Sequence, residues 1–122
     1  MFAVLKQLGA HDIYDSAVDR IKKHGFSVSD TYDPYSGEID VWGALLLACG
    51  ASEKLLKTGE TEPEKCGVPP YMCSRARFFC DYLELITDME IGEWCSMHTK
   101  QDAISLLGTA GDRVAVTFTQ PN

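Results

Sequence analysis

The ten residues at positions 41–50, VWGALLLACG, constrain the fold most strongly, because they contain no charged side chain. Asp40 stands directly before them, where a carboxylate can cap a helix, and Gly50 can end the helix. A helix without a polar face must be covered by other elements, so we expect this segment at the centre of the core. It is far shorter than the roughly 20 apolar residues that cross a bilayer.

The segment at residues 12–25, DIYDSAVDRIKKHG, repeats apolar residues at helical spacing. We expect an amphipathic helix with Asp12 as its N-cap and with Gly25 in the left-handed conformation at its C-terminal end. A short helix is also predicted at residues 2–8. The polar residues 26–40, rich in Ser, Asp, Pro and Gly, predict a long loop.

Two later segments have helical spacing as well. Pro70 suits the first position of a helix that continues through Thr87. Arg77 and Asp81 stand four residues apart on this helix, and we predict that they pair.

The last helix is predicted to begin after Thr99 and Asp102, which have the spacing of a capping box. After Gly111 the pattern fits both a helix and a strand, and we favour the helix. The predicted fold class is therefore all-α: a compact, single-domain bundle over residues 1–122 with about four to five helices and a long polar loop after the first amphipathic one.

The charge of the chain restricts its partners. It carries 18 acidic and 11 basic residues, a formal net charge of -7. This excess disfavours nucleic acid and anionic membranes, which are bound through basic side chains. An acidic inhibitor that mimics nucleic acid stays open as an alternative, although the acids are scattered singly. No secretion signal is visible, so we expect a cytoplasmic location.

The five cysteines show no spacing typical of zinc sites or disulfide frameworks. Thiols stay free in a reducing compartment, and we expect Cys66, Cys73 and Cys80 to be small core residues. Motifs for metal ions, nucleotides and serine hydrolysis are also missing. We therefore predict no metal and no cofactor, and favour a protein that is not an enzyme.

One stretch, EWCSMHT, places Cys95 three residues before His98. A thiol near an imidazole and ahead of a helix N-terminus can be a nucleophile, which would require a low pKa for Cys95. No third group that would orient His98 is visible, and the neighbouring Trp94 favours packing. The alternative that we favour is a hydrophobic bend before the last helix.

An aromatic and acidic group lies in and just after the loop at residues 26–40. Its members are Asp30, Tyr32, Asp33, Tyr35, Asp40 and Trp42. Tyrosine and tryptophan supply much of the binding energy of protein interfaces, so the loop members of this group are the candidate interaction surface. For Trp42 we favour a place in the core.

Several short motifs follow one another along the chain: HGF at residues 24–26, an acidic loop, VWGALLLACG at residues 41–50, and Trp94 followed by Thr99. This pattern resembles a family of small uncharacterised actinobacterial and actinophage helical proteins. The resemblance implies a compact helical fold, a phage or actinobacterial origin, and a structural role for Trp94 and Thr99 at the entry to the last helix. It implies no reaction, and Cys95 stands where the family has asparagine.

The leading functional hypothesis is a small cytoplasmic accessory protein that acts by binding another protein and needs no cofactor. The second hypothesis is the acidic inhibitor that mimics nucleic acid. The third is a thiol- or metal-dependent enzyme centred on Cys95 and His98.

Overall fold

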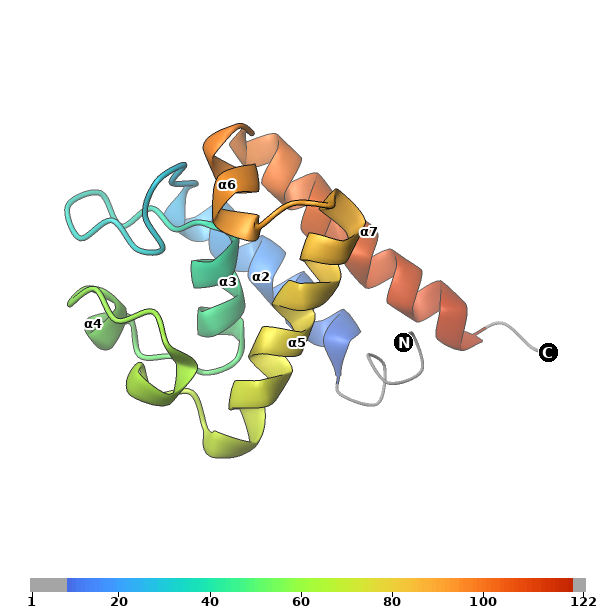
Figure 1. Cartoon of the computed structure of the whole chain (residues 1–122), viewed down its shortest axis with the longest axis horizontal. Coiled ribbons are helices and arrows are strands. Elements are labelled where there is room, and N and C mark those ends of the chain that lie inside the picture. Colours follow the sequence, from blue (N-terminus) through green and yellow to red (C-terminus); the bar gives the residue numbers. More distant parts are fainter. Residues whose placement is uncertain (1–8, 120–122) are drawn as a thin grey trace.

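The computed structural model of the chain describes residues 9–119, with side chains through Val114. Helices dominate it, and no β-strand occurs between residues 9 and 119 (Figure 1). The prediction of an all-α, single-domain bundle is therefore confirmed, while the helix predicted at residues 2–8 lies outside the described residues. In chain order the elements are α2 (Ala10–His24), α3 (Val41–Ala48), α4 (Glu53–Leu56), the 3-10 turn η1 (Pro63–Lys65), α5 (Pro70–Thr87), α6 (Ile91–Ser96) and α7 (Lys100–Thr119).

Helix α3 is the buried centre of the bundle, as its sequence predicts. Six of its eight residues are buried, and α2 packs extensively against both α3 and α7. Asp40 is the N-cap of α3, because its carboxylate accepts a hydrogen bond of 2.8 Å from the Gly43 N–H. The chain turns away after Ala48 through Gly50, whose φ of 107° suits glycine alone.

Helix α2 begins earlier than its sequence suggests. Its N-cap is Gly9, which is in the left-handed conformation, so the prediction of Asp12 as N-cap is wrong. Asp12 lies inside the first turn instead, where its charge favours the positive end of the helix dipole. The extension is stabilised because it buries Ala10 completely. Gly25 ends the helix with a φ of 87°, which favours glycine, but its ψ of 170° lies outside the left-handed helical region, so the predicted left-handed cap does not form.

The polar segment at residues 26–40 is a loop, as expected, but it is tied to the bundle at several points. Ile39 is fully buried and bridges to both Phe26 and Tyr32. The His24 ring bonds the Gly37 carbonyl through Nδ1 at 3.1 Å. Each tie fixes the path of the loop across the end of α2 and over the start of α3.

Gly43 brings the loop and α3 unusually close together. A Cβ at this position would overlap the carbonyl oxygen of Thr31 and press on Ile39. Only glycine therefore allows the loop backbone to lie against the first turn of α3. This contact also fixes Thr31 at the edge and Asp40 at the base of the cleft described below.

The second half of the chain matches its predicted helices with one difference. Helix α5 begins at Pro70 and ends at Thr87, as predicted. The bend expected around Cys95 is a short helix, α6, because the Glu90 carboxylate caps it by accepting from the backbone N–H groups of Gly92 and Glu93. The favoured helix beyond Gly111 is confirmed, since α7 continues to residue 119.

The capping box at the start of α7 is confirmed. The Thr99 N–H donates to the Asp102 carboxylate at 3.1 Å, and the Asp102 N–H donates to the Thr99 hydroxyl oxygen at 3.2 Å. In contrast, Arg77 does not pair along its own helix with Asp81. Its guanidinium binds Glu64 through two bonds of 2.6 Å. The carboxylate of Glu64 is the better partner because both of its oxygens face the guanidinium fork.

Candidate functional site: an acidic cleft between α3, α5 and α6

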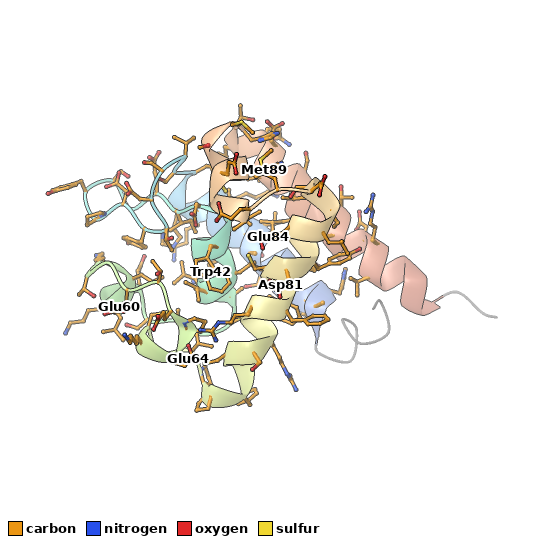
Figure 2. The ribbon with its side chains drawn as sticks, in the orientation of Figure 1. Trp42, Glu60, Glu64, Asp81, Glu84 and Met89 are labelled. Carbon is orange, nitrogen blue, oxygen red and sulfur yellow. The ribbon has the colours of Figure 1, made fainter. Side chains whose placement is uncertain are left out.

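A cleft of about 350 Å³ opens where α5 diverges from α3, with α6 closing one end. Figure 2 shows Trp42, Asp81 and Glu84 together on this face of the molecule. Its volume lies at the small end of the range for ligand pockets, so it has room for a side chain or two. The lining residues are Thr31, Asp40, Trp42, Arg77, Cys80, Asp81, Glu84, Glu90, Ile91 and Gly92.

Carboxylates dominate the polar lining of the cleft. Asp81 and Glu84 come from α5 and are three residues apart, so they lie on the same side of that helix. Glu84 accepts a 2.7 Å hydrogen bond from the Ile91 N–H, and Glu90 caps α6. These bonds to the start of α6 hold the two glutamates in place, and the exposed Asp81 is the lining carboxylate for which the structure gives no bond.

Asp40 lies at the base of the cleft and is only 7% exposed. Burial raises the pKa of its carboxyl to about 7, although hydrogen bonds from the backbone of Gly43 and Trp42 favour the ionised form. The nearby Glu90 and Asp30 add to the increase through their charges. A positive charge that entered the cleft would therefore stabilise ionised Asp40, since charges of opposite sign attract strongly where water is excluded.

Arg77 is the basic residue among those that line the cleft, and its charge is already matched. The guanidinium and the Glu64 carboxylate form a bidentate pair that joins α5 to the segment before it. Hydrogen bonding to Arg77 lowers the pKa of Glu64 to about 2. Because Glu64 neutralises Arg77, the other carboxylates of the lining keep the cleft negative.

Trp42 forms the aromatic wall of the cleft. Its indole N–H donates a 2.9 Å hydrogen bond to the Thr61 carbonyl oxygen, which anchors the ring to the segment between α4 and η1. The side chain is half-buried and packs against the core at its inner edge. Trp42 is thus partly a core residue, as we favoured, and partly a surface of the cleft.

The structure separates the residues of the predicted interaction surface. Tyr32 is buried, and its hydroxyl donates a 3.0 Å hydrogen bond to Glu53, so its prediction as an exposed contact residue is wrong. The Asp33 carboxylate accepts from the Tyr35 N–H at 2.9 Å, and this bond lowers the pKa of Asp33. Tyr35 is 97% exposed, and Asp30 is exposed as well. Asp33 therefore stabilises the loop itself, and Tyr32 ties the loop to α4.

Cys95 and His98 do not form a reactive pair in this structure. Cys95 is buried, and burial raises the pKa of its thiol to about 12, the opposite of what a nucleophilic thiolate requires. The His98 ring stacks on Trp94 with a centroid distance of 4.0 Å, and its Nδ1 bonds the Trp94 carbonyl oxygen at 2.7 Å. With the Thr99 cap, these contacts fix the turn from α6 to α7, which agrees with a structural role for Trp94.

The five cysteines are buried and unpaired, as expected of core residues. Within the described part of the chain, no group of three or more His, Cys, Asp or Glu side chains converges to hold a metal ion. Over the same residues, no helix has the length and apolar character needed to cross a membrane.

Sequence reasoning named Asp40 but did not assign Asp81, Glu84 or Glu90 to a site. Asp81 and Glu84 have a signal, because acids three residues apart share one side of a predicted helix. Nothing near them in the sequence indicates that Trp42 lies opposite. A comparison of the chain with protein-family models, with curated proteins and with solved structures found no match.

Proposed function

We propose that this protein is a small, non-enzymatic accessory protein of the cytoplasm that acts by binding another protein, and that the acidic cleft is where the partner docks. The observation that carries the proposal is the combination of a concave site, an aromatic wall at Trp42 and carboxylates held by the start of α6. Protein interfaces are enriched in tryptophan at the centre and polar at the rim. A phage or actinobacterial origin remains a proposal from the resemblance of the sequence.

Two features argue against a catalytic use of the same cleft. Its one thiol, Cys80, is buried, and burial raises the pKa of that thiol far above the physiological range. The carboxylates Glu84 and Glu90 are engaged as caps of α6. Binding through the cleft needs neither a reactive thiol nor a free acid and base.

The test is to block the cleft without changing the core. Asp81 is exposed on α5, so Asp81→Tyr places a bulky ring at the cleft while leaving the buried face of the helix intact. Asp19→Tyr on the exposed side of α2 is the matched control, since α2 runs behind α3 in Figure 1. Tagged proteins expressed in the organism that carries the gene serve as bait.

We expect one partner protein to be recovered with the wild type and with Asp19→Tyr, and to fall about tenfold with Asp81→Tyr, which corresponds to a loss of about 1.4 kcal/mol. The purified partner should then show the same ranking in a direct affinity measurement, binding the wild type and Asp19→Tyr more tightly than Asp81→Tyr. Equal recovery by the two tyrosine variants would show that the partner docks elsewhere.

The nucleic-acid-mimicking inhibitor is the second candidate. The observation in its favour is that Glu60, Glu64, Asp81 and Glu84 lie along one face of the molecule (Figure 2). A mimic would occupy the nucleic-acid site of its partner, so a DNA duplex added to the purified complex should displace it. If excess duplex does not displace the protein, the hypothesis of a nucleic-acid mimic is rejected and the accessory role is retained.

A further inference from the structure

We infer that the segment of the partner that enters the cleft is basic, and that an arginine side chain lies along Trp42 with its guanidinium beside Asp81. This inference rests on the proposed function and specifies the chemistry of the partner. It follows from the charge and shape of the cleft, which accept some side chains and reject others.

Charge complementarity predicts that the side chain that enters the cleft is positively charged. The lining holds Asp40, Asp81, Glu84 and Glu90, while its one cation, Arg77, is bound to Glu64. An acidic side chain would be repelled by these carboxylates and a neutral donor could gain only a hydrogen bond, whereas a cation would be attracted by all of them. A cation in the cleft would also stabilise the ionised form of the buried Asp40 at its base, which adds to the preference for a cation.

The aromatic wall favours arginine over lysine. A planar guanidinium stacks on an aromatic ring and can bind a carboxylate with two parallel hydrogen bonds, whereas an ammonium group binds as a point charge. Trp42 supplies the ring, and the exposed Asp81 supplies a carboxylate that no other side chain between residues 9 and 114 engages. Arg77 and Glu64 already form such a fork at 2.6 Å beside the cleft.

The two tryptophans give a direct measurement. Trp42 lines the cleft, whereas Trp94 is buried at the turn from α6 to α7 and stacks on His98. We would titrate the ¹⁵N-labelled protein at low salt with a short alanine peptide that carries three arginines. The indole N–H signals of the two tryptophans are then followed by NMR, which detects weak binding as well as tight binding.

The Trp42 signal should shift and saturate, and the Trp94 signal should stay in place. A peptide with citrulline, the neutral isostere of arginine, should produce no shift. A lysine peptide should bind about threefold more weakly, because it loses the stacking of the guanidinium. Equal shifts with the citrulline peptide, or equal shifts of both tryptophans, would overturn the inference.

Variants test the electrostatics in both directions. Asp81→Lys should weaken binding about tenfold, while Asp19→Lys on α2 should leave it within about twofold of the wild type. Arg77→Gln should tighten binding about threefold, because it leaves Glu64 unpaired at the edge of the cleft. A gain of affinity cannot come from unfolding, so this variant guards against a trivial loss. Binding by Asp81→Lys that is as tight as or tighter than binding by Asp19→Lys would contradict the inference.

The outcomes separate this inference from the proposed function. If Asp81→Tyr releases the cellular partner but the arginine peptide leaves Trp42 unchanged, the cleft is the docking site and the inferred chemistry is wrong. If the arginine peptide binds in the cleft but Asp81→Tyr retains the partner, the cleft binds cations and the proposed docking function is wrong.

Discussion

The loop at residues 26–40 and the acidic cleft are built from the same kinds of side chain, yet they differ in what those side chains are free to do. In the loop, Tyr32 and Asp33 are engaged by Glu53 and by the backbone of the loop itself. In the cleft, Trp42 and Asp81 line a hollow of about 350 Å³. Acidic and aromatic composition alone therefore does not identify an interaction surface.

The difference arises from the neighbours of each region. The loop folds over the end of α2 and closes on itself, because Ile39 is buried beneath it and draws its two ends together. The cleft is bounded by α3 and α5, which diverge and leave polar side chains facing each other across a gap. Thr31 and Gly43 connect the two regions, since the loop backbone at Thr31 lies against Gly43 and also lines the cleft.

Gly43→Ala should break both regions at once and have the largest effect. Its Cβ would overlap the Thr31 carbonyl oxygen, which is backbone and cannot rotate away. We expect a loss of at least ~4 kcal/mol in the free energy of unfolding, measured by urea denaturation. Gly108→Ala on α7 is the control, because nothing lies within 4 Å of its added Cβ.

The control should gain about 0.5 to 1 kcal/mol, since alanine favours helix over glycine. Similar stabilities for the two alanine variants would mean that the loop does not press on α3 as described.

Asp40→Asn should remove a pH dependence that belongs to the cleft. The pKa of this carboxyl is near the ordinary aspartate value of 3.8 in the unfolded chain and is raised by burial to about 7 in the folded protein. The folded state therefore holds more protons between these values, and its stability falls as the pH rises through them. Asparagine keeps an oxygen that can cap α3, so the variant should lack this fall. Between pH 4 and pH 8, the free energy of unfolding of the variant should rise by about 4 kcal/mol relative to that of the wild type.

Urea midpoints measured across this pH range test the prediction. Asp40→Ala separates the charge from the cap, because it should also lack the fall but lose about 1 kcal/mol at every pH. Parallel pH profiles for the wild type and Asp40→Asn would show that burial of the carboxyl is not what controls this slope.

Tyr32→Phe sharpens the comparison from the side of the loop. It removes the hydroxyl that donates to Glu53 at 3.0 Å, so we expect a loss of about 1 kcal/mol by thermal or urea unfolding. Tyr35→Phe, at a side chain that is 97% exposed, should change nothing. Neither change should alter binding of the arginine peptide. An equal cost for the two variants would remove the distinction between an engaged and a free tyrosine.

Arg77→Gln should have the smallest effect on stability. The Arg77–Glu64 pair has good geometry, but its side chains are 45% and 54% exposed, and solvent screens such pairs. We expect a loss below about 1 kcal/mol that shrinks further at high salt. A larger loss that salt does not reduce would mean that the pair holds the wall of the cleft in place.

Much of the helical framework could be predicted because its signals are local. Pro70 at the start of α5, Asp40 at the start of α3 and the capping box at Thr99 each act within one helical turn. The local signal at Asp12 predicts the wrong N-cap. It has the side chain of an N-cap, but burial of Ala10 against other helices extended α2 beyond it.

The candidate site could not be predicted, because it depends on contacts between distant segments. The sequence places Arg77 and Asp81 four residues apart, and only the folded chain brings Glu64 closer to the guanidinium. Likewise, Cys95 and His98 are neighbours in sequence, yet one is buried and the other stacks on Trp94. Residues that are close in the sequence therefore do not form a reactive pair in the folded protein.

The sequence by itself determined the all-α class, the buried central helix and most helix ends, because periodicity and capping are properties of neighbouring residues. Tertiary structure decided which polar side chains form hydrogen bonds within the protein and which face a cavity. The cleft joins Thr31, Asp40 and Trp42 to residues 77–92, and their separation in the chain is bridged only when α5 settles beside α3. Its shape follows from the angle at which packed helices diverge, a quantity that no short stretch of sequence contains.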